Sequence, residues 1–363
     1  MSWVFLSIVF VLLRACCGLT AMPPSVVIKS LQNLAPADST IEWSRLEGFL
    51  VEKLPLGYKD WSLTSSWSEE LSGIIGSTTS KDFQQIFARV LSDGNWESAA
   101  EYARMRSDAP WVVLVTGLNG IRKTTSMQQP WFNEVLGEAL GDRAGTAELP
   151  SGTNSFFRQL DYLMATIANE EFKDLYLKAS KLSTSEYSSE KDGIFKRYRT
   201  FAECCGVQLV RSAQKDKLNV LVETSGRDVA SFDYVDALFP PESGYQKLAI
   251  HFTIDDIRHA ERSVDVRMLS EMKEGEIVVT GGGDARKIVS VNAGGPYGSD
   301  ILKAVQADAT RVWAAIAEDA DGRRKDWHKA SIKIFGDVDA AAWSACAVLP
   351  DGTDSATRHI FRR

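Results

Sequence analysis

Apolar residues recur at helical spacing through the first third of the chain. The periodic stretches at 41–54 and 82–106 predict helices, so residues from about 23 to 107 form a predicted helical region. This region is either a small helical domain or a helical layer packed against the rest of the chain. Its tryptophans are expected to anchor the packing, because large aromatic side chains gain most from burial: Trp43, Trp61, Trp67 and Trp96.

The pattern changes after Asp108. A continuous apolar run, typical of a strand buried within a parallel sheet, occurs at 111–117, and two further buried strands are predicted at 218–226 and 245–253. Helical periodicity predicts helices at 124–140, 155–179, 194–216, 254–272 and 299–319. Pro130 is expected to kink or restart the first of these helices. Strands that alternate with helices indicate an α/β layered fold with a mostly parallel sheet.

The remaining segments are less regular. The Ser-rich stretch 180–193 predicts a mobile loop, and 276–291 predicts a hairpin around three glycines. Residues 330–336 and the two arms around 350–352 are predicted to form a small C-terminal β element. The chain is thus divided into a helical N-terminal region, 22–108, and an α/β domain, 109–363.

Composition and charge limit the classes of function. Of the 363 residues, 44% are hydrophobic and 25% are charged, which excludes wholesale disorder. The net charge of −7 repels phosphate backbones, so nucleic-acid binding is not expected.

The N-terminal segment 1–21 is interpreted as a secretory signal or targeting segment. Its apolar run at 3–13 is too short to span a bilayer as a helix, so no membrane-spanning segment is expected there. Arg14 follows this run directly and no basic residue precedes it, which leaves a buried or membrane-touching helix of a cytoplasmic protein as the alternative.

The five cysteines do not have the spacing of a disulfide framework. Cys16 and Cys17 lie in the N-terminal segment, Cys204 and Cys205 are adjacent, and Cys346 stands alone. No CxxC pair and no Cys/His metal spacing occurs, so we expect a reduced interior and no metal site built from Cys and His.

The residues after the first predicted strand are the most informative part of the sequence. They open the helix predicted from residue 124, and they read Gly117, Leu118, Asn119, Gly120, Ile121, Arg122, Lys123, Thr124 and Thr125. A strand, a Gly-rich loop and a Lys-Thr pair at a helix start are the features of a phosphate-binding loop. Lys123 would contact the β- and γ-phosphates of ATP or GTP, and Thr124 would hold Mg²⁺. The alternative is a Gly-rich turn without a ligand.

One position departs from the GxxxxGK[ST] pattern, because Arg122 stands where the last glycine is usual. If this residue adopts a positive φ, its side chain costs roughly 1–2 kcal/mol. If its backbone is right-handed, Arg122 costs little and places a second cation beside the phosphates.

A phosphotransferase also needs a carboxylate and further cations near the loop. Glu223 follows the apolar residues of the second predicted strand, with Arg227 just beyond it, where a sheet of this kind presents functional side chains. Arg258 and Arg262 share a face of the helix predicted at 254–272 and would form a lid, or else a salt-bridged surface.

Two other segments have both a functional and a plain structural interpretation. Arg158 and Asp161, three residues apart, would face an acceptor pocket or form an ion pair within a helix. The segment 292–299 would bind an anion at a helix start, or would be a turn in which Ser299 caps the helix.

These motifs, in this order, resemble the zeta-toxin-like branch of P-loop kinases over about residues 110–270. The resemblance rests on the loop, on NSFFRQLD (154–161) as a substrate motif, on VLVETSGRD (220–228) as a strand-end motif, and on the arginines from 258 onward. It implies a P-loop NTPase-type three-layer fold, with Lys123 and Thr124 binding nucleotide and metal, Glu223 as the strand-end acid that also serves the metal, and Arg158 on the substrate side. The acid expected early in the substrate motif is Ser155 here, and Asp161 would substitute for it.

The leading hypothesis is therefore an ATP- or GTP-dependent small-molecule kinase that uses Mg²⁺. Asp161 or Glu223 would orient the acceptor hydroxyl, Arg258 or Arg262 would stabilise the moving phosphoryl group, and Arg227 would contact substrate. The competing hypothesis is a nucleotide-binding regulatory protein without catalysis, whose helical N-terminal region engages a protein partner. A GTPase or motor ATPase has no support, because no switch motif follows the loop.

Overall fold

A computed structural model describes residues 23–53, 61–145, 148–292, 294–336 and 342–362. The interpretation of 1–21 as a signal therefore lies outside the described residues. The region up to Met105 is helical, as predicted, and α5, α6 and α7 divide what the sequence pattern joined at 82–106. Its helices are α2 (Pro24–Gln32), α3 (Trp43–Lys53), α4 (Trp61–Ile75), α5 (Lys81–Ile86), α6 (Ala88–Asp93) and α7 (Trp96–Met105).

A seven-stranded sheet forms the centre of the molecule, in the order β2-β3-β1-β4-β5-β6-β7. The pairs from β2 to β5 are parallel, and the pairs β5–β6 and β6–β7 are antiparallel. This mixed α/β arrangement is consistent with a P-loop NTPase-type fold that carries a C-terminal β element, as predicted. The strands are β1 (Trp111–Thr116), β2 (Ser155–Arg158), β3 (Asn219–Glu223), β4 (Gln246–Ile254), β5 (Trp327–Gly336), β6 (Ala342–Val348) and β7 (His359–Arg362).

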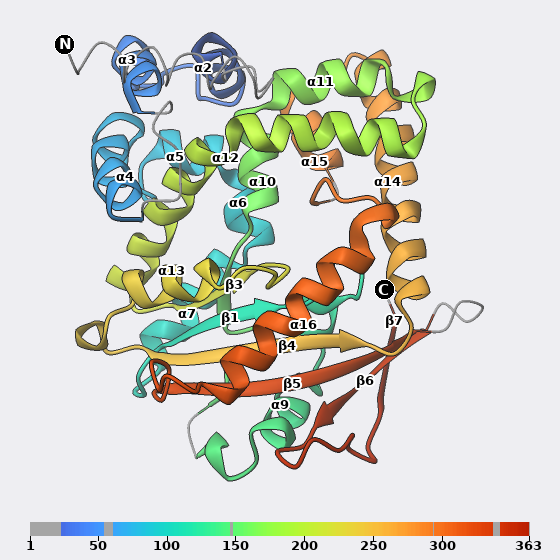
Figure 1. Ribbon diagram of the computed structural model, residues 1–363. Helices are drawn as coiled ribbons and strands as arrows, with labels where there is room; N and C mark the ends of the chain where they lie inside the picture. The colour runs from blue at the N-terminus through green and yellow to red at the C-terminus, as the bar shows by residue number, and fades with distance from the viewer. Residues whose placement is uncertain (1–22, 54–60, 146–147, 293, 337–341, 363) are drawn as a thin grey trace, which may run out of the picture.

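Helices cover both faces of the sheet, which explains why β1 is apolar throughout. Val112 and Leu114 belong to the core that contains α10, α12 and α13, whereas Val113 and Val115 belong to the core that contains α9. Figure 1 shows α9 on the opposite side of the sheet from α12 and α13. The helices after β1 are α8 (Lys123–Met127), α9 (Phe132–Leu140), α10 (Leu160–Ile167), α11 (Asn169–Leu177), α12 (Thr184–Lys215), α13 (Ala230–Leu238), α14 (Ile257–Thr280), α15 (Ala285–Val291) and α16 (Leu302–Glu318). The break between α8 and α9 contains Pro130, as predicted.

The N-terminal helices pack as a layer on the same core as α12. Buried residues of α2 to α7 form one continuous cluster with α10, α12 and one face of the sheet. Trp67 is buried in this cluster, and Trp43 and Trp96 pack against it, as predicted, while the side chain of Trp61 is not described. Figure 1 shows α2 and α3 farthest from the sheet.

The helix predicted at 155–179 is wrong at its start, because residues 155–158 form the edge strand β2. Ser155 pairs with Asn219 and Arg158 with Val222 in parallel register along β3. Phe156 and Phe157 lie at helical spacing from Leu160, so the local pattern could not separate the strand from the helix that follows it.

Two other predicted segments are also wrong. The Ser-rich stretch 180–193 is not a loop beyond Ser183, because a capping box formed by Ser183 and Glu186 starts α12 there. The predicted hairpin at 276–291 is the end of α14, a glycine turn, and α15, whose first turn is capped by Asp284.

The described cysteines Cys204, Cys205 and Cys346 are free and buried. Among the helices of the described residues, none combines the length and the apolar character that crossing a bilayer requires.

Candidate functional site

The predicted phosphate loop forms a tight turn between β1 and α8. Gly117 and Gly120 have φ values of +128° and +85°. A Cβ atom on Gly117 would lie 2.4 Å from the carbonyl oxygen of Phe252, and one on Gly120 would lie 2.7 Å from that of Ala260. Both positions therefore require glycine, because β4 and α14 pack directly against the loop.

Three of the residues predicted for this site converge below the loop. The Lys123 ammonium donates hydrogen bonds to the carbonyl oxygens of Gly117 and Leu118, at 2.9 and 2.8 Å. It also lies 3.3 Å from Oε1 of Glu223, and the Thr124 hydroxyl donates to Oε2 of the same carboxylate at 2.9 Å. The strand-end acid thus links the lysine and the threonine of the loop.

Burial and the charge of Glu223 shift the pKa of Lys123 in opposite directions. Lys123 is only 4% exposed, and this burial lowers the pKa of its ammonium, whereas the charge of Glu223 raises it. Glu223 is partly exposed at the end of β3, where it reaches both the buried ammonium and the surface. The buried Lys123 ammonium is therefore held by two carbonyl oxygens and one carboxylate, and that carboxylate, Glu223, also reaches the surface.

Asp161 lies close to the loop in a second cluster. A Cβ on Gly295 would lie 3.3 Å from Nδ2 of Asn119 and 3.5 Å from Oδ2 of Asp161. A Cβ on Gly294 would lie 3.0 Å from Nη1 of Arg267. Residues 294–295 therefore lie against an asparagine of the phosphate loop, an acid at the start of α10 and an arginine of α14.

The pKa of Asp161 is raised, mainly because burial disfavours the charged carboxylate. Nearby Glu223 adds to this rise, while the positive charges of Lys191 and Arg267 oppose it. A carboxylate with a raised pKa accepts a proton more readily than an ordinary aspartate.

The two arginines expected to form a lid, Arg258 and Arg262, lie at the exposed surface of α14. Arg258 has a side chain that is 80% exposed and pairs with Asp256, the N-cap residue of α14. Arg262 is exposed on the same helix. Arg267, further along the same helix, is the α14 arginine that lies near Asp161.

Arg158 is buried in β2 and ties this edge strand to α12. Its guanidinium forms an ion pair with Glu203 and lies 4.9 Å from the ring centroid of Tyr234. Glu203 also accepts a hydrogen bond from Arg199 at 2.9 Å. Arg158 thus pairs with a glutamate of α12 and not with Asp161, because residues 155–158 are a strand.

Two further predicted residues contact aromatic rings. Arg122 has a φ of +64°, the strained alternative considered above, and its guanidinium lies 5.5 Å from the ring centroid of Trp343 in β6. Arg227, just after β3, donates to the Tyr297 hydroxyl at 3.2 Å.

Ser299 lies in a short 3-10 turn and does not cap α16, so the expected N-cap was wrong.

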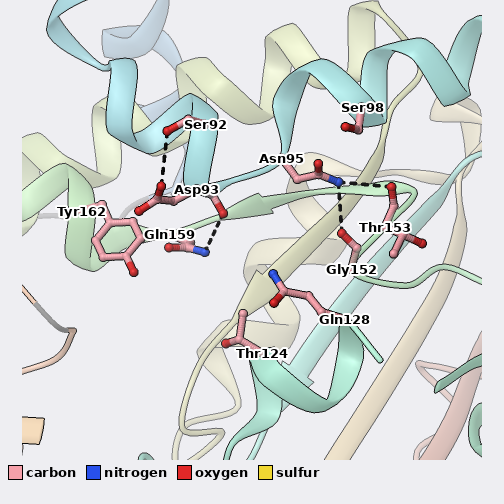
Figure 2. Close-up of a pocket in the computed structure, with 10 residues that line it drawn as sticks. All are labelled: Ser92, Asp93, Asn95, Ser98, Thr124, Gln128, Gly152, Thr153, Gln159 and Tyr162. Carbon is pink, nitrogen blue, oxygen red and sulfur yellow. Dashed lines mark hydrogen bonds between the residues drawn. The ribbon is translucent and has the colours of Figure 1, made fainter. Parts of the chain in front are cut away.

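A pocket of about 630 Å³ opens beside the phosphate loop. Figure 2 shows that Thr124 of α8 and Gln128, the residue just after α8, form one side of it, and that Gly152 and Thr153 lie next to them. Asp93, Asn95, Gln159 and Tyr162 complete much of the wall. The N-terminal helical region therefore contributes to this pocket, which the sequence pattern did not indicate.

The turn between α6 and α7 is held in the pocket wall by the edge strand. The backbone N–H of Phe157 donates to the carbonyl oxygen of Gly94 at 2.8 Å. The Asn95 amide donates to the carbonyl oxygens of Gly152 and Thr153, at 3.0 and 3.2 Å. The left-handed conformation of Asn95, with a φ of 60°, is a turn feature that the Gly-Asn pair in the sequence could have suggested.

Comparisons with known proteins find only distant similarity for this chain. No protein-family model matches the sequence, and no curated protein matches it. One of the matching solved structures comes from a study titled as a characterisation of the PezAT chromosomal toxin-antitoxin system of Streptococcus pneumoniae. The match has 12% identity and a TM-score of 0.36, and it covers 74% of this chain and 81% of that chain. These values are too low to establish a family.

Proposed function

We propose that this protein is a nucleotide-dependent phosphotransferase that moves the γ-phosphate of ATP or GTP to a hydroxyl group of a small molecule. The observation that carries the proposal is the convergence of Lys123 and Thr124 on Glu223 at a Gly-rich loop that follows β1, a strand inside the sheet. An anion in this loop would exchange the two carbonyl contacts of Lys123 for contacts with phosphate oxygens.

The oxygen donors at the loop suit Mg²⁺. The Thr124 hydroxyl and the Glu223 carboxylate lie 2.9 Å apart, and hard oxygen ligands of this kind, together with phosphate oxygens, are what Mg²⁺ prefers. Within the described residues, no group of three or more His, Cys, Asp and Glu side chains could hold a metal ion by itself. The proposed Mg²⁺ site thus depends on the phosphates of the nucleotide.

Asp161 and Arg267 supply the remaining chemistry. Asp161 would accept the proton of the acceptor hydroxyl as its oxygen bonds to the γ-phosphorus. The bond from that phosphorus to the bridging oxygen breaks, and the nucleoside diphosphate leaves with the electron pair. Arg267 would neutralise charge on the transferring group, the role first assigned to Arg258 or Arg262. The phosphate loop, Asp161, Glu223 and the arginines of α14 follow one another along the chain in the order described above for zeta-toxin-like kinases. This order supports a kinase of that type.

Nucleotide binding tests this proposal directly. In the full-length protein with Mg²⁺, Lys123→Ala should weaken ATP or GTP binding by about 10- to 100-fold, because charge-assisted hydrogen bonds to the phosphates are lost. Isothermal titration calorimetry measures this change. Lys303→Ala serves as the control, since the Lys303 side chain is 78% exposed and should leave binding unchanged. Absence of saturable binding by the wild type, or equal affinity in Lys123→Ala, would refute the proposal.

A second candidate is a nucleotide-binding regulatory protein without phosphotransfer. It is favoured by the position of Ser155, which is fully buried in β2 and donates to the side-chain oxygen of Asn154. This residue cannot replace the missing acid of the substrate motif. In this alternative the N-terminal helical region engages a protein partner. Acceptor-dependent loss of the γ-phosphate would exclude the alternative.

A further inference from the structure

The pocket beside the phosphate loop indicates the class of acceptor. Thr124, the residue proposed to hold Mg²⁺, is part of the pocket wall. Gln159 and Tyr162, which flank Asp161 in the chain, also line it. The pocket therefore adjoins the proposed Mg²⁺ ligand and the start of α10, the helix that carries Asp161.

The charge of the pocket is low. Asp93 is the one carboxylate among the residues that line it, and no lysine or arginine is among them. The nearest partner of Asp93 is Arg89, whose Nε donates to Oδ2 at 3.0 Å. Arg89 also donates to the carbonyl oxygen of Asn292 at 2.9 Å, and its guanidinium lies 3.9 Å from the ring centroid of Tyr162. Arg89 is thus already engaged by Asp93, by a backbone carbonyl and by the Tyr162 ring. The pocket wall itself offers an anionic ligand no lysine or arginine.

The other lining side chains are neutral hydrogen-bonding groups. Gln128 is exposed, and within the described part of the chain its side-chain amide makes no hydrogen bond. The Thr153 hydroxyl is 2.9 Å from that of Ser151, and the Gln159 amide donates to the carbonyl oxygen of Asp93 at 3.2 Å. Amides and hydroxyls both donate and accept, so together they match ligand hydroxyls, which do the same. The ring of Tyr162 adds an apolar surface.

We propose that the acceptor is an uncharged polyhydroxylated molecule, a free sugar or a sugar alcohol, bound by Gln128, Thr153, Gln159 and Tyr162. Phosphorylated sugars and nucleotide-linked sugars are disfavoured, because no lysine or arginine lines the pocket to balance their phosphate charge. This inference rests on the proposed phosphotransferase function and gives it a substrate class.

The test uses the full-length protein with Mg²⁺ and γ-labelled ATP. The neutral probes are D-glucose, D-mannitol and myo-inositol, and the anionic probes are their phosphate esters and UDP-glucose. Saturation-transfer NMR measures binding, and label transfer measures phosphorylation. At least one neutral probe should bind and accept label, and each anionic probe should bind more weakly than its neutral counterpart.

Two pocket variants and a control locate the site. Gln128→Ala should raise the KM of the neutral acceptor by about three- to tenfold, with ATP affinity unchanged, because one neutral hydrogen bond is lost. Gln32→Ala, at an exposed glutamine of α2, should change neither value. Ser98→Arg places a cation at an exposed position of the pocket wall and should shift the preference several-fold toward the phosphate esters.

The possible failures are distinguishable. If ATP binds but the anionic probes bind better than the neutral ones, or no neutral probe binds, the acceptor class is wrong while the proposed function stands. An unchanged KM in Gln128→Ala would also overturn the assignment of this pocket. If ATP does not bind, the proposed function itself fails.

Discussion

Arg122 shows how a single residue can depart from a motif without changing the local backbone. Its φ of +64° lies in the left-handed region that glycine occupies without strain, so Arg122 adopts a backbone conformation suited to the glycine that is usual at this position. The guanidinium points to Trp343 of the C-terminal β element, and this contact offsets part of the strain.

Two substitutions at this position separate the strain from the aromatic contact. Arg122→Gly loses the contact but relieves the strain, whereas Arg122→Ala loses the contact and keeps the strained backbone. We therefore expect the glycine variant to be more stable than the alanine variant by about 1 kcal/mol. Urea unfolding of both variants measures the difference. Equal stabilities would show that the loop relaxes to a right-handed backbone.

At the scale of elements, helix boundaries depended on capping side chains more than on composition. The polar sequence that starts α12 reads as a loop, but Ser183 and Glu186 form reciprocal hydrogen bonds with the backbone of its first turn. Tyr187, one residue later, is buried and donates to Glu271 of α14 at 2.8 Å, so tertiary contacts also hold this turn.

Removal of this cap should destabilise the protein measurably. Ser183→Ala is expected to lower the free energy of unfolding by about 1 kcal/mol, because a backbone N–H at the start of α12 loses its acceptor. Ser189→Ala is the matched control, since Ser189 is exposed inside the helix and alanine has the higher helix propensity. Chemical denaturation compares the two. A Ser183→Ala protein as stable as the control would show that the cap contributes little.

At the scale of the whole molecule, the buried His251 should make the free energy of unfolding depend on pH. It lies in the central strand β4, its Nδ1 is 2.9 Å from the Thr116 hydroxyl, and its ring stacks on Trp313 of α16. Burial, together with the charge of Lys123, lowers the pKa of His251 to about 4.

This pKa predicts the direction of a pH effect on stability. The unfolded chain, with an ordinary histidine pKa of about 6.5, binds a proton that the folded chain does not bind until the pH approaches 4. The free energy of unfolding should therefore fall as the pH falls from about 6.5 to 4, and it should be independent of His251 above that range. NMR titration of the imidazole in the folded protein tests this expectation. A midpoint near 6.5 would contradict it.

The amino-acid sequence by itself determined the parts of this protein that depend on local chemistry. The buried strand β1 follows from a continuous apolar run, because a strand covered on both faces has no polar side, and β3 and β4 follow from mostly apolar segments. The loop at 117–125 follows from its glycines and its Lys-Thr pair, and Glu223 follows from an acid placed at the end of an apolar strand.

Only the tertiary structure decided the parts that depend on distant neighbours. β2 is a strand because its backbone pairs with β3, a contact that helical periodicity in 155–179 conceals. Arg158 joins Glu203 and Arg267 approaches Asp161 because α12 and α14 pack where local spacing gives no information. The pocket is assembled from Asn95, Thr124 and Thr153, which are far apart in sequence, and such a surface exists only once the N-terminal helices pack on the edge of the sheet.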